Sequence, residues 1–570
     1  MRRLPLVALS LLLVGLLAAG GGSAKPKPKP KAPPRPVTPA QKLHAIHHFV
    51  VIYEENHSFD NLYGGWEGVN GLQYAGVRAT QVNQTGAPYA CLRQNDVNLA
   101  SPPLPATCTD TTTGTPFSSA FPNAPFSIDR YIPPTAVTCP PTLKAFSFPN
   151  GLLNGDPQAL PGGCTRDIVH RFYQEIFQLD SGKQDRYVTG SDAIGLVMGY
   201  YDTKSLPIYR YLHQPGHPRY AILDDFFQAA FGGSFLNHQW LIAAATPTYA
   251  GAPDTLHSIV DGNGFPNASY PLYKPATPVR DGALTVACPS PVAGLACGDY
   301  AVNTTQPAFQ PSGLFGAKLP PQTNPTIGDR LSEKHIGWAW YSGGWSNANG
   351  DTTQPGWTNG TGPKCGDPDV DPGVAAYPHC PNNLFQYHHQ PFNYYAAFST
   401  ATDEGKTNRN AHLKDEAEFL QLAQSSTAAC KLKTVSFVKP IGQENEHPGY
   451  ASEPKGSDHL VSLIQAVEGS KCAADTMVIV TYDEFGGQWD HVPPPGQGGT
   501  PGPHDQWGPG TRVPALVISP YLPASFVVDH SEHDTTSILA TLEHRYKLAP
   551  LGTRDAAVRD LSSAFSAKAP

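Results

Sequence analysis

Two pairs of oxygen-bearing side chains follow two apolar segments that are far apart in the chain. Glu55 and Asn56 come after HHFVVIY (47–53), and Asp483 and Glu484 come after TMVIVTY. Burial of such groups is costly unless something binds them. Carboxylate and amide oxygens are the ligands that hard divalent cations prefer. The pattern therefore predicts one divalent metal ion, of unknown identity, at the ends of two strands.

A serine in a glycine-rich setting is the candidate nucleophile. Ser234 stands in GGSFLNHQW (232–240), where two glycines let the backbone approach an anion closely. The GxSxG pattern is missing, which argues against an α/β-hydrolase. A metal ion makes a serine oxygen nucleophilic without a separate strong base. Taken alone, Ser234 is better explained as an ordinary helix cap.

Several of the 21 histidines stand in polar settings and are candidates for acid–base or phosphate-binding roles: His170, His388, His389, His447 and His491. A single histidine is more often structural, so each needs support from its neighbours. The HSEHD segment does not have the spacing of a zinc-binding HExxH helix.

The elements that must position these groups are short strands alternating with helices. Apolar, β-rich runs at 47–53, 434–440, 475–484 and 512–520 are typical of strands covered on both faces. Helical patterns cover 165–179, 411–424, 456–468 and 532–547. This alternation predicts a mainly parallel sheet with helices on both faces. Such sheets bind ligands at the carboxyl ends of their strands, where the two ligand pairs lie.

The N-terminus has the pattern of an export signal. Arg2 and Arg3 precede an apolar stretch, and small residues follow at 22–24, so we expect a signal peptide over 1–24 and a secreted or cell-envelope protein. The stretch is short for the alternative, an uncleaved membrane anchor. A Lys/Pro-rich linker is expected over 25–44. It acts as a tether, or makes weak contact with an anionic envelope surface.

Cysteine and loop composition fit an exported protein. The ten cysteines suggest local pairs, with the connectivity left open: Cys91/Cys108, Cys139/Cys164, Cys288/Cys297, Cys365/Cys380 and Cys430/Cys472. Long insertions, stapled by disulfides, are expected at about 80–163, 247–327 and 346–382, with a C-terminal tail at 551–570. Since the net charge of −8 includes a basic N-terminus, the remaining chain is acidic, which argues against nucleic-acid binding.

Ordered sequence blocks from about residue 45 to 550 resemble the bacterial phosphoesterase family, which contains secreted acid phosphatases and phosphatidylcholine-type phospholipases C. EENHSFDNLYG is similar to its ENRSFD signature, with His57 where arginine is common. Further blocks are SDAIGLVMGYYD, FFQAAFGGSFLNHQWL, IGWAWYSGGW, YHHQPFNYY, HPGYAS, TYDEFGGQWDHVPPP and WGPGTRVPALVISPY.

The resemblance implies an alkaline-phosphatase-like α/β/α sandwich that covers 45–550. It implies a metal held by Glu55, Asn56, Ser234, Asp483 and Glu484, with Ser234 as the nucleophile. It also places His170, Asp192, His388, His389 and His447 around the phosphate, and we assign substrate binding to Asn56 and His491.

The resemblance favours hydrolysis of phosphate monoesters through a phosphoserine intermediate. Phospholipases C of the family tend to have a threonine nucleophile in a PTNPN-like setting, whereas the Ser234 block and WAWYSGGW resemble the acid-phosphatase branch. The expected substrate is therefore a small phosphate ester, with a phospholipid as the alternative. A non-catalytic envelope binding protein on the same fold is a third possibility, although such a protein has no need of the nucleophile.

Overall fold

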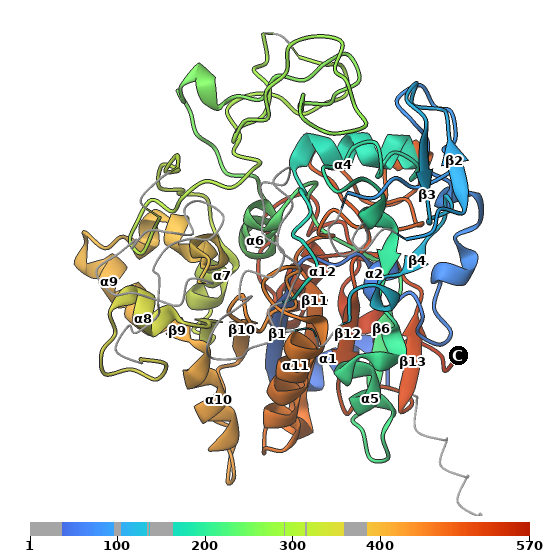
Figure 1. Cartoon of the computed structure of the whole chain (residues 1–570). Coiled ribbons are helices and arrows are strands. Elements are labelled where there is room, and N and C mark those ends of the chain that lie inside the picture. The colour runs from blue at the N-terminus through green and yellow to red at the C-terminus, as the bar shows by residue number, and fades with distance from the viewer. Residues whose placement is uncertain are drawn as a thin grey trace, which may run out of the picture. The chain divides into compact units, whose positions relative to one another are not determined.

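An eight-stranded sheet runs through the chain in the order β13-β6-β12-β11-β1-β10-β8-β9 (Figure 1). We describe a computed structural model over residues 37–95, 104–133, 136, 163–289, 291–313, 316–357 and 385–570. The strands are β1 (His48–Glu54), β6 (Tyr220–Leu223), β8 (Trp338–Ser342), β9 (Leu413–Asp415), β10 (Val435–Lys439), β11 (Thr476–Tyr482), β12 (Ala515–Ile518) and β13 (Phe526–Asp529). β12 is antiparallel to β11 and β6, and the other adjacent pairs are parallel.

The four predicted strands are confirmed as β1, β10, β11 and β12, and three of them form the centre of the sheet. β11, β1 and β10 lie side by side, and their apolar side chains are buried. Central parallel strands are covered on both faces, which explains their continuous apolar sequences. The strands that sequence patterns did not predict, β6, β8, β9 and β13, have three to five residues each, too few for a distinct period.

The helices of the described chain join and flank these strands. They are α1 (Pro39–Ala45), α2 (Phe59–Leu62), α4 (Phe172–Leu179), α5 (Pro207–His213), α6 (Ser234–Ala243), α7 (Ile327–Glu333), α8 (Trp345–Asn349), α9 (Asp403–His412), α10 (Glu416–Gln424), α11 (Glu453–Glu468) and α12 (Thr536–Tyr546).

The sequence located α11 and α12 but misplaced the start of two other helices. The helix expected over 165–179 begins only at Phe172, so His170 lies in an irregular segment before it. The helix expected over 411–424 is wrong in its first part, because Leu413–Asp415 pairs with β8 as strand β9. Asp415 then caps α10 by accepting a hydrogen bond from the Ala417 N–H.

Helices cover both faces of the sheet, as two neighbouring side chains of β8 show. Successive side chains of a strand point to opposite faces. Trp340 lies against His238 of α6, whereas Tyr341 lies against Phe419 of α10. α6 and α10 therefore cover opposite faces, and α11 packs beside α10 (Figure 1). The expected α/β sandwich around a mainly parallel sheet is confirmed.

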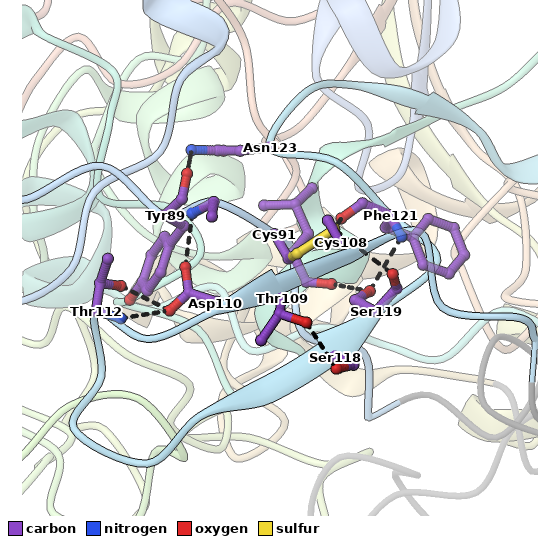
Figure 2. Close-up of a disulfide and its surroundings, with 12 residues drawn as sticks. Tyr89, Cys91, Cys108, Thr109, Asp110, Thr112, Ser118, Ser119, Phe121 and Asn123 are labelled. Atoms are coloured by element: carbon purple, nitrogen blue, oxygen red, sulfur yellow. Dashed lines mark hydrogen bonds between the residues drawn. A yellow bond between two sulfur atoms is a disulfide. The ribbon is translucent and has the colours of Figure 1, made fainter.

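Disulfides and short two-stranded sheets support the segments outside the main sheet. The short strands are β2 (Cys108–Asp110), β3 (Phe117–Ser119), β4 (Phe126–Ser127), β5 (Gly199–Tyr200), β7 (Phe226–Phe227) and β14 (His533–Asp534). The expected Cys91–Cys108 disulfide anchors β2 (Figure 2), and Cys288–Cys297 and Cys430–Cys472 are also present. The remaining two expected pairs, and most of 346–382, involve residues outside the described part of the chain.

The two ends of the described chain belong to the folded domain, which corrects two expected boundaries. Residues 39–44, assigned to the linker, belong to α1, where Leu43 is buried. The segment 551–570, assigned to a tail, contains the helical turn η13 (Leu561–Ser566), which packs against α1. The expected signal peptide lies outside the described residues. Within those residues, no helix has both the length and the apolar character needed to cross a membrane.

The packing of η13 predicts that the C-terminal segment stabilises the domain. Phe565 is 3% exposed, and Lys42 of α1 donates a hydrogen bond to its carbonyl oxygen (3.2 Å). Phe565→Ala should lower the free energy of unfolding by about 3–5 kcal/mol, measured by denaturant titration, because it leaves a cavity. The control Val77→Ala, at an 88% exposed position, should change it by less than about 0.5 kcal/mol. Equal, small effects would mean that 551–570 is a detached tail.

Candidate functional site

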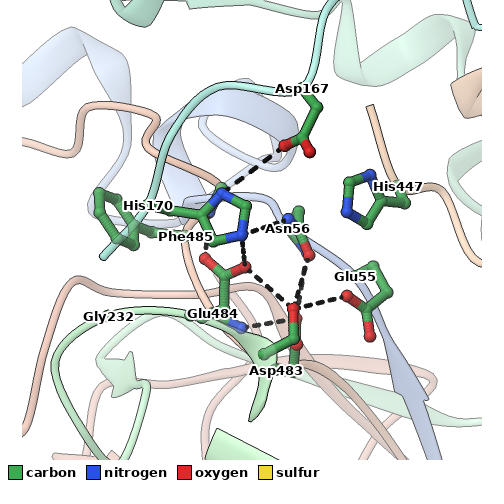
Figure 3. Close-up of polar contacts among 12 residues, drawn as sticks. Glu55, Asn56, Asp167, His170, Gly232, His447, Asp483, Glu484 and Phe485 are labelled. Atoms are coloured by element: carbon green, nitrogen blue, oxygen red, sulfur yellow. Dashed lines mark hydrogen bonds and ion pairs between the residues drawn. The ribbon is translucent and has the colours of Figure 1, made fainter. Parts of the chain in front are cut away.

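The two ligand pairs predicted from the sequence meet at one edge of the sheet. Glu54 pairs with Tyr482 in the β1–β11 register, so the residues that follow each strand lie at the same level. The Asn56 N–H donates to Asp483 Oδ1 (3.2 Å). Asn56 has φ 62°, a left-handed conformation that asparagine tolerates better than most residues, and the chain turns sharply after β1. Figure 3 shows Glu55 and Asn56 facing Asp483 and Glu484.

Ser234 joins these groups from the first residue of α6. Its Oγ lies 2.9 Å from Glu55 Oε2, 3.3 Å from Glu484 Oε1 and 3.4 Å from Asn56 Oδ1. The preceding turn needs glycine, because Gly232 has φ 90° and a Cβ there would lie 2.7 Å from the Phe172 nitrogen. The five residues predicted to bind a metal are thus brought together around one serine oxygen.

His170 fixes the orientation of the Asn56 amide. His170 Nδ1 lies 2.5 Å from the Ile168 carbonyl oxygen, so it carries the proton and donates. Nε2 then accepts a hydrogen bond from Asn56 Nδ2 (3.3 Å; Figure 3). This leaves Asn56 Oδ1 toward Ser234, at 3.4 Å from its Oγ. Burial lowers the pKa of His170 to about 4, which favours this neutral form.

A cavity of about 240 Å³ opens above Ser234. Three predicted histidines line it, namely His170, His388 and His447, together with the N-terminal end of α6. A helix N-terminus favours an anion, because its first N–H groups and the helix dipole point outward. The insertion 247–327 also contributes to the lining, through Val302, Asn303 and Thr304. This insertion, expected as a surface loop, therefore also shapes the cavity.

The carboxylates below Ser234 are fully buried, and their charges repel one another. Burial, followed by the charge of Glu55, raises the pKa of Asp483 well above its ordinary value. Burial, followed by the charge of Asp483, does the same for Glu484. Asp483 Oδ2 is buried without a hydrogen-bond partner. A divalent cation fits this donor set, because it would bind that oxygen and balance the excess negative charge.

The structure separates the two adjacent histidines and adds two residues that sequence reasoning missed. His388 lines the cavity, whereas His389 Nε2 lies 3.2 Å from Glu55 Oε1, behind the carboxylate. Lys439 and His238 also contact Glu55 from this side. Both had a detectable signal: Lys439 lies near the end of the predicted strand 434–440, and His238 lies one helical turn after Ser234.

Asp192 and His491 are not among the residues that line the cavity. Asp192 pairs with Arg166 and accepts a hydrogen bond from the Val169 N–H (3.1 Å), so it holds the segment that carries His170. His491 contacts Asp60 (2.5 Å) in a buried cluster whose positive charge is the Arg512 guanidinium. Its expected role in substrate binding has no support from this position.

His57, which departs from the family signature, is buried away from the cavity. Its Nδ1 contacts Asn61 Oδ1 (2.5 Å), and its Nε2 contacts the Glu446 carbonyl oxygen (3.0 Å). Burial lowers its pKa to about 4. A neutral histidine therefore braces the turn after β1.

The fold and the site define an α/β protein with a buried, oxygen-rich group of side chains, which fits a cation, beneath a serine at a helix N-terminus. The Phosphoesterase family matches residues 46–138 and 149–549, which is most of the chain. The chain therefore belongs to this family, and the resemblance seen in its sequence blocks is confirmed.

Curated relatives match only part of the chain. Phospholipase C B of Mycobacterium tuberculosis (strain ATCC 25618 / H37Rv) is 36% identical over 161 residues, which cover 25% of this chain and 30% of that protein. Non-specific phospholipase C6 of Arabidopsis thaliana is 28% identical over 150 residues, which cover 22% and 28%. The chain thus spans less than a third of the length of these relatives.

A solved structure of a protein in the alkaline phosphatase superfamily from Vibrio parahaemolyticus aligns over 71% of this chain and 74% of its own. The identity is 12% and the TM-score 0.25, which is too low to support an argument. The fold assignment rests on the sheet topology described above.

The crowded carboxylates predict opposite effects of Asp483→Asn on metal binding and on the stability of the metal-free protein. Loss of a direct ligand should weaken metal binding by more than about 100-fold, measured by titration, because even indirect partners of metal ligands contribute 10–100-fold. The melting temperature of the metal-free protein should rise, because one buried charge is removed. Asp403→Asn, at a fully exposed position on α9, is the control and should leave metal affinity unchanged. Full metal binding by Asp483→Asn would show that the ligand set is wrong.

Proposed function

We propose that this protein is a metal-dependent hydrolase of small phosphate monoesters, similar to an acid phosphatase, that acts through a phosphoserine intermediate. The observation that carries the proposal is the position of Ser234 Oγ. It lies within 3.4 Å of three oxygen ligands, at the floor of a cavity lined by three histidines and a helix N-terminus. This arrangement supplies a nucleophile, a cation site and groups that bind an anion.

The size of the cavity supports a small substrate. Its volume of about 240 Å³ is below the range of about 300–1,000 Å³ of pockets for drug-sized ligands. The large apolar side chains that are exposed in the described chain (Val37, Tyr74, Val77 and Ile259) do not line it. The cavity therefore suits a phosphoryl group with a compact leaving group better than the acyl chains of a lipid.

Phospholipase C activity is the second candidate, and the names of the curated relatives favour it. Both relatives described above are phospholipases C. A lipid headgroup phosphate has the same chemistry at Ser234 as a monoester, provided that the acyl chains stay outside the cavity.

Each side chain of the site has its own role in the proposed reaction. Glu55, Asn56, Ser234, Asp483 and Glu484 would hold a divalent ion, which lowers the pKa of the serine hydroxyl and polarises the phosphoryl group. The hydrogen bond to Glu55 Oε2 holds Ser234 Oγ in place for in-line attack on phosphorus. The N-terminus of α6 and His447 face the phosphoryl oxygens, where charge accumulates during transfer.

His388 is the histidine placed to protonate the leaving oxygen, because it lines the cavity and His389 does not. The same group can then take a proton from the water that hydrolyses the phosphoserine. His170 acts as a positioning residue, because its hydrogen bond turns Asn56 Oδ1 toward Ser234.

We also propose that the protein is exported and works in the cell envelope or outside the cell. Three disulfides in the described chain support an oxidising compartment. The Lys/Pro-rich segment would then tether the domain or contact the envelope.

A hydrolysis panel tests the substrate class. Because the cavity admits only a compact group, kcat/KM for a small phosphate monoester should exceed that for phosphatidylcholine by about tenfold or more. A chelator should abolish both activities, and added divalent metal should restore them. Faster release of phosphocholine from the lipid than of phosphate from the monoester would reverse the order of the two candidates.

The stereochemistry at phosphorus tests the covalent step. Two successive in-line displacements, first by Ser234 and then by water, retain the configuration of a chiral phosphate ester. Ser234→Ala should lower kcat by several orders of magnitude, because the nucleophile and a metal ligand are lost together. Inversion at phosphorus in the wild-type reaction would mean direct attack by water and would remove Ser234 from this role.

A further inference from the structure

One oxygen of Glu55 faces three nitrogen groups on the side away from Ser234. While Oε2 contacts the serine, Oε1 lies 2.5 Å from Lys439 Nζ, 3.2 Å from His389 Nε2 and 3.9 Å from His238 Nε2. All four side chains are almost completely buried. This group, which we call the rear cluster, lies between the end of β1, the end of β10, α6 and the segment before Pro391.

The two imidazoles of the rear cluster direct ring nitrogens toward the same carboxylate oxygen, Glu55 Oε1. Their rings stack in parallel, with centroids 4.8 Å apart. His238 Nδ1 lies 2.8 Å from the Ser234 carbonyl oxygen, so Nδ1 carries the proton and Nε2 carries the lone pair that faces Glu55. One ligand atom from each of Glu55, His238 and His389 lies within 4.8 Å of the other two. Two histidines and one carboxylate are a common donor set for zinc.

Lys439 supplies a cation at the same place. Its ammonium group is in direct contact with Glu55 Oε1 and donates to the Tyr53 carbonyl oxygen (2.9 Å). It enters from β10, the strand next to β1, so the sheet itself fixes its position. A buried ammonium needs an anionic partner, and Glu55 provides it.

The charges of the region agree with one metal ion rather than two. The site contains the carboxylates of Glu55, Asp483 and Glu484 and the ammonium of Lys439, all fully buried. Three negative charges and one positive charge leave a net charge of −2, which one divalent ion balances. A second divalent ion beside the ammonium would place excess positive charge in a buried region.

We propose that Glu55, His238 and His389 form a second cation position and that the ammonium of Lys439 is its resident cation. The protein therefore holds one exchangeable metal ion, at Ser234. Removal of the ammonium converts the rear cluster into a binding site for a second transition-metal ion such as Zn²⁺. This inference rests on the proposed metal site but not on which phosphate ester is hydrolysed.

Metal counting tests the proposal without any activity measurement. The full-length wild type, loaded with Zn²⁺ and freed of excess metal, should contain one ion per chain by elemental analysis. Lys439→Ala should contain two, and Co²⁺ in the new site should show the visible absorption of nitrogen ligation. Lys439→Ala/His389→Ala should return to one ion. Lys439→Arg, which keeps the positive charge, is the matched control and should stay at one.

Other outcomes would overturn the proposal in distinguishable ways. A folded Lys439→Ala protein with one ion would refute it and leave the proposed function intact. Two ions in the wild type, one of them lost in His389→Ala, would show that the rear cluster holds a metal itself. If Lys439→Ala does not fold, this His389→Ala comparison can still refute the proposal, which requires one ion in both proteins. No ion in the wild type would refute the metal-dependent function as well.

Discussion

Three fully buried carboxylates lie beneath one serine, namely those of Glu55, Asp483 and Glu484. Their negative charge must be balanced for the folded site to form. Protein groups supply part of the balance. Lys439 contacts Glu55, and the Asn56 N–H donates to Asp483. The remaining negative charge fits a bound cation, since unpaired carboxylates in such a place would otherwise have to be protonated. The same negative charge explains why a phosphate would need a bound cation and a helix N-terminus to approach.

The sheet places these groups with little freedom, because neighbouring parallel strands end at the same edge. β11, β1 and β10 are adjacent, and they deliver Asp483, Glu55 and Lys439 to that edge. α6 then brings two groups from one helical turn, Ser234 above the carboxylates and His238 behind them. Catalytic geometry in the proposed reaction would thus be set by backbone pairing rather than by mobile loops.

The segments outside the sheet decide what can reach the serine. Val302, Asn303 and Thr304 of the insertion 247–327 form one wall of the cavity. Asn303 also accepts a hydrogen bond from the Phe172 N–H (3.2 Å), which ties this wall to the start of α4. The segment before α4 carries His170 and is held by Asp192. The same surface segments therefore limit the size of the substrate and set the orientation of the Asn56 amide.

The sequence by itself determined the central strands, the ligand pairs that follow two of them, and Ser234. These features are local: an apolar run defines a strand, and a polar residue directly after it must lie at the edge of the sheet. Only the tertiary structure decided which histidine faces the cavity, because His388 and His389 are adjacent in sequence but contact different partners. The tertiary structure also places Asp192 and His491 outside the lining of the cavity, and it places Lys439 and His238 in contact with Glu55. Those contacts join segments far apart in the chain, and local sequence patterns place each residue on its element without specifying which groups meet.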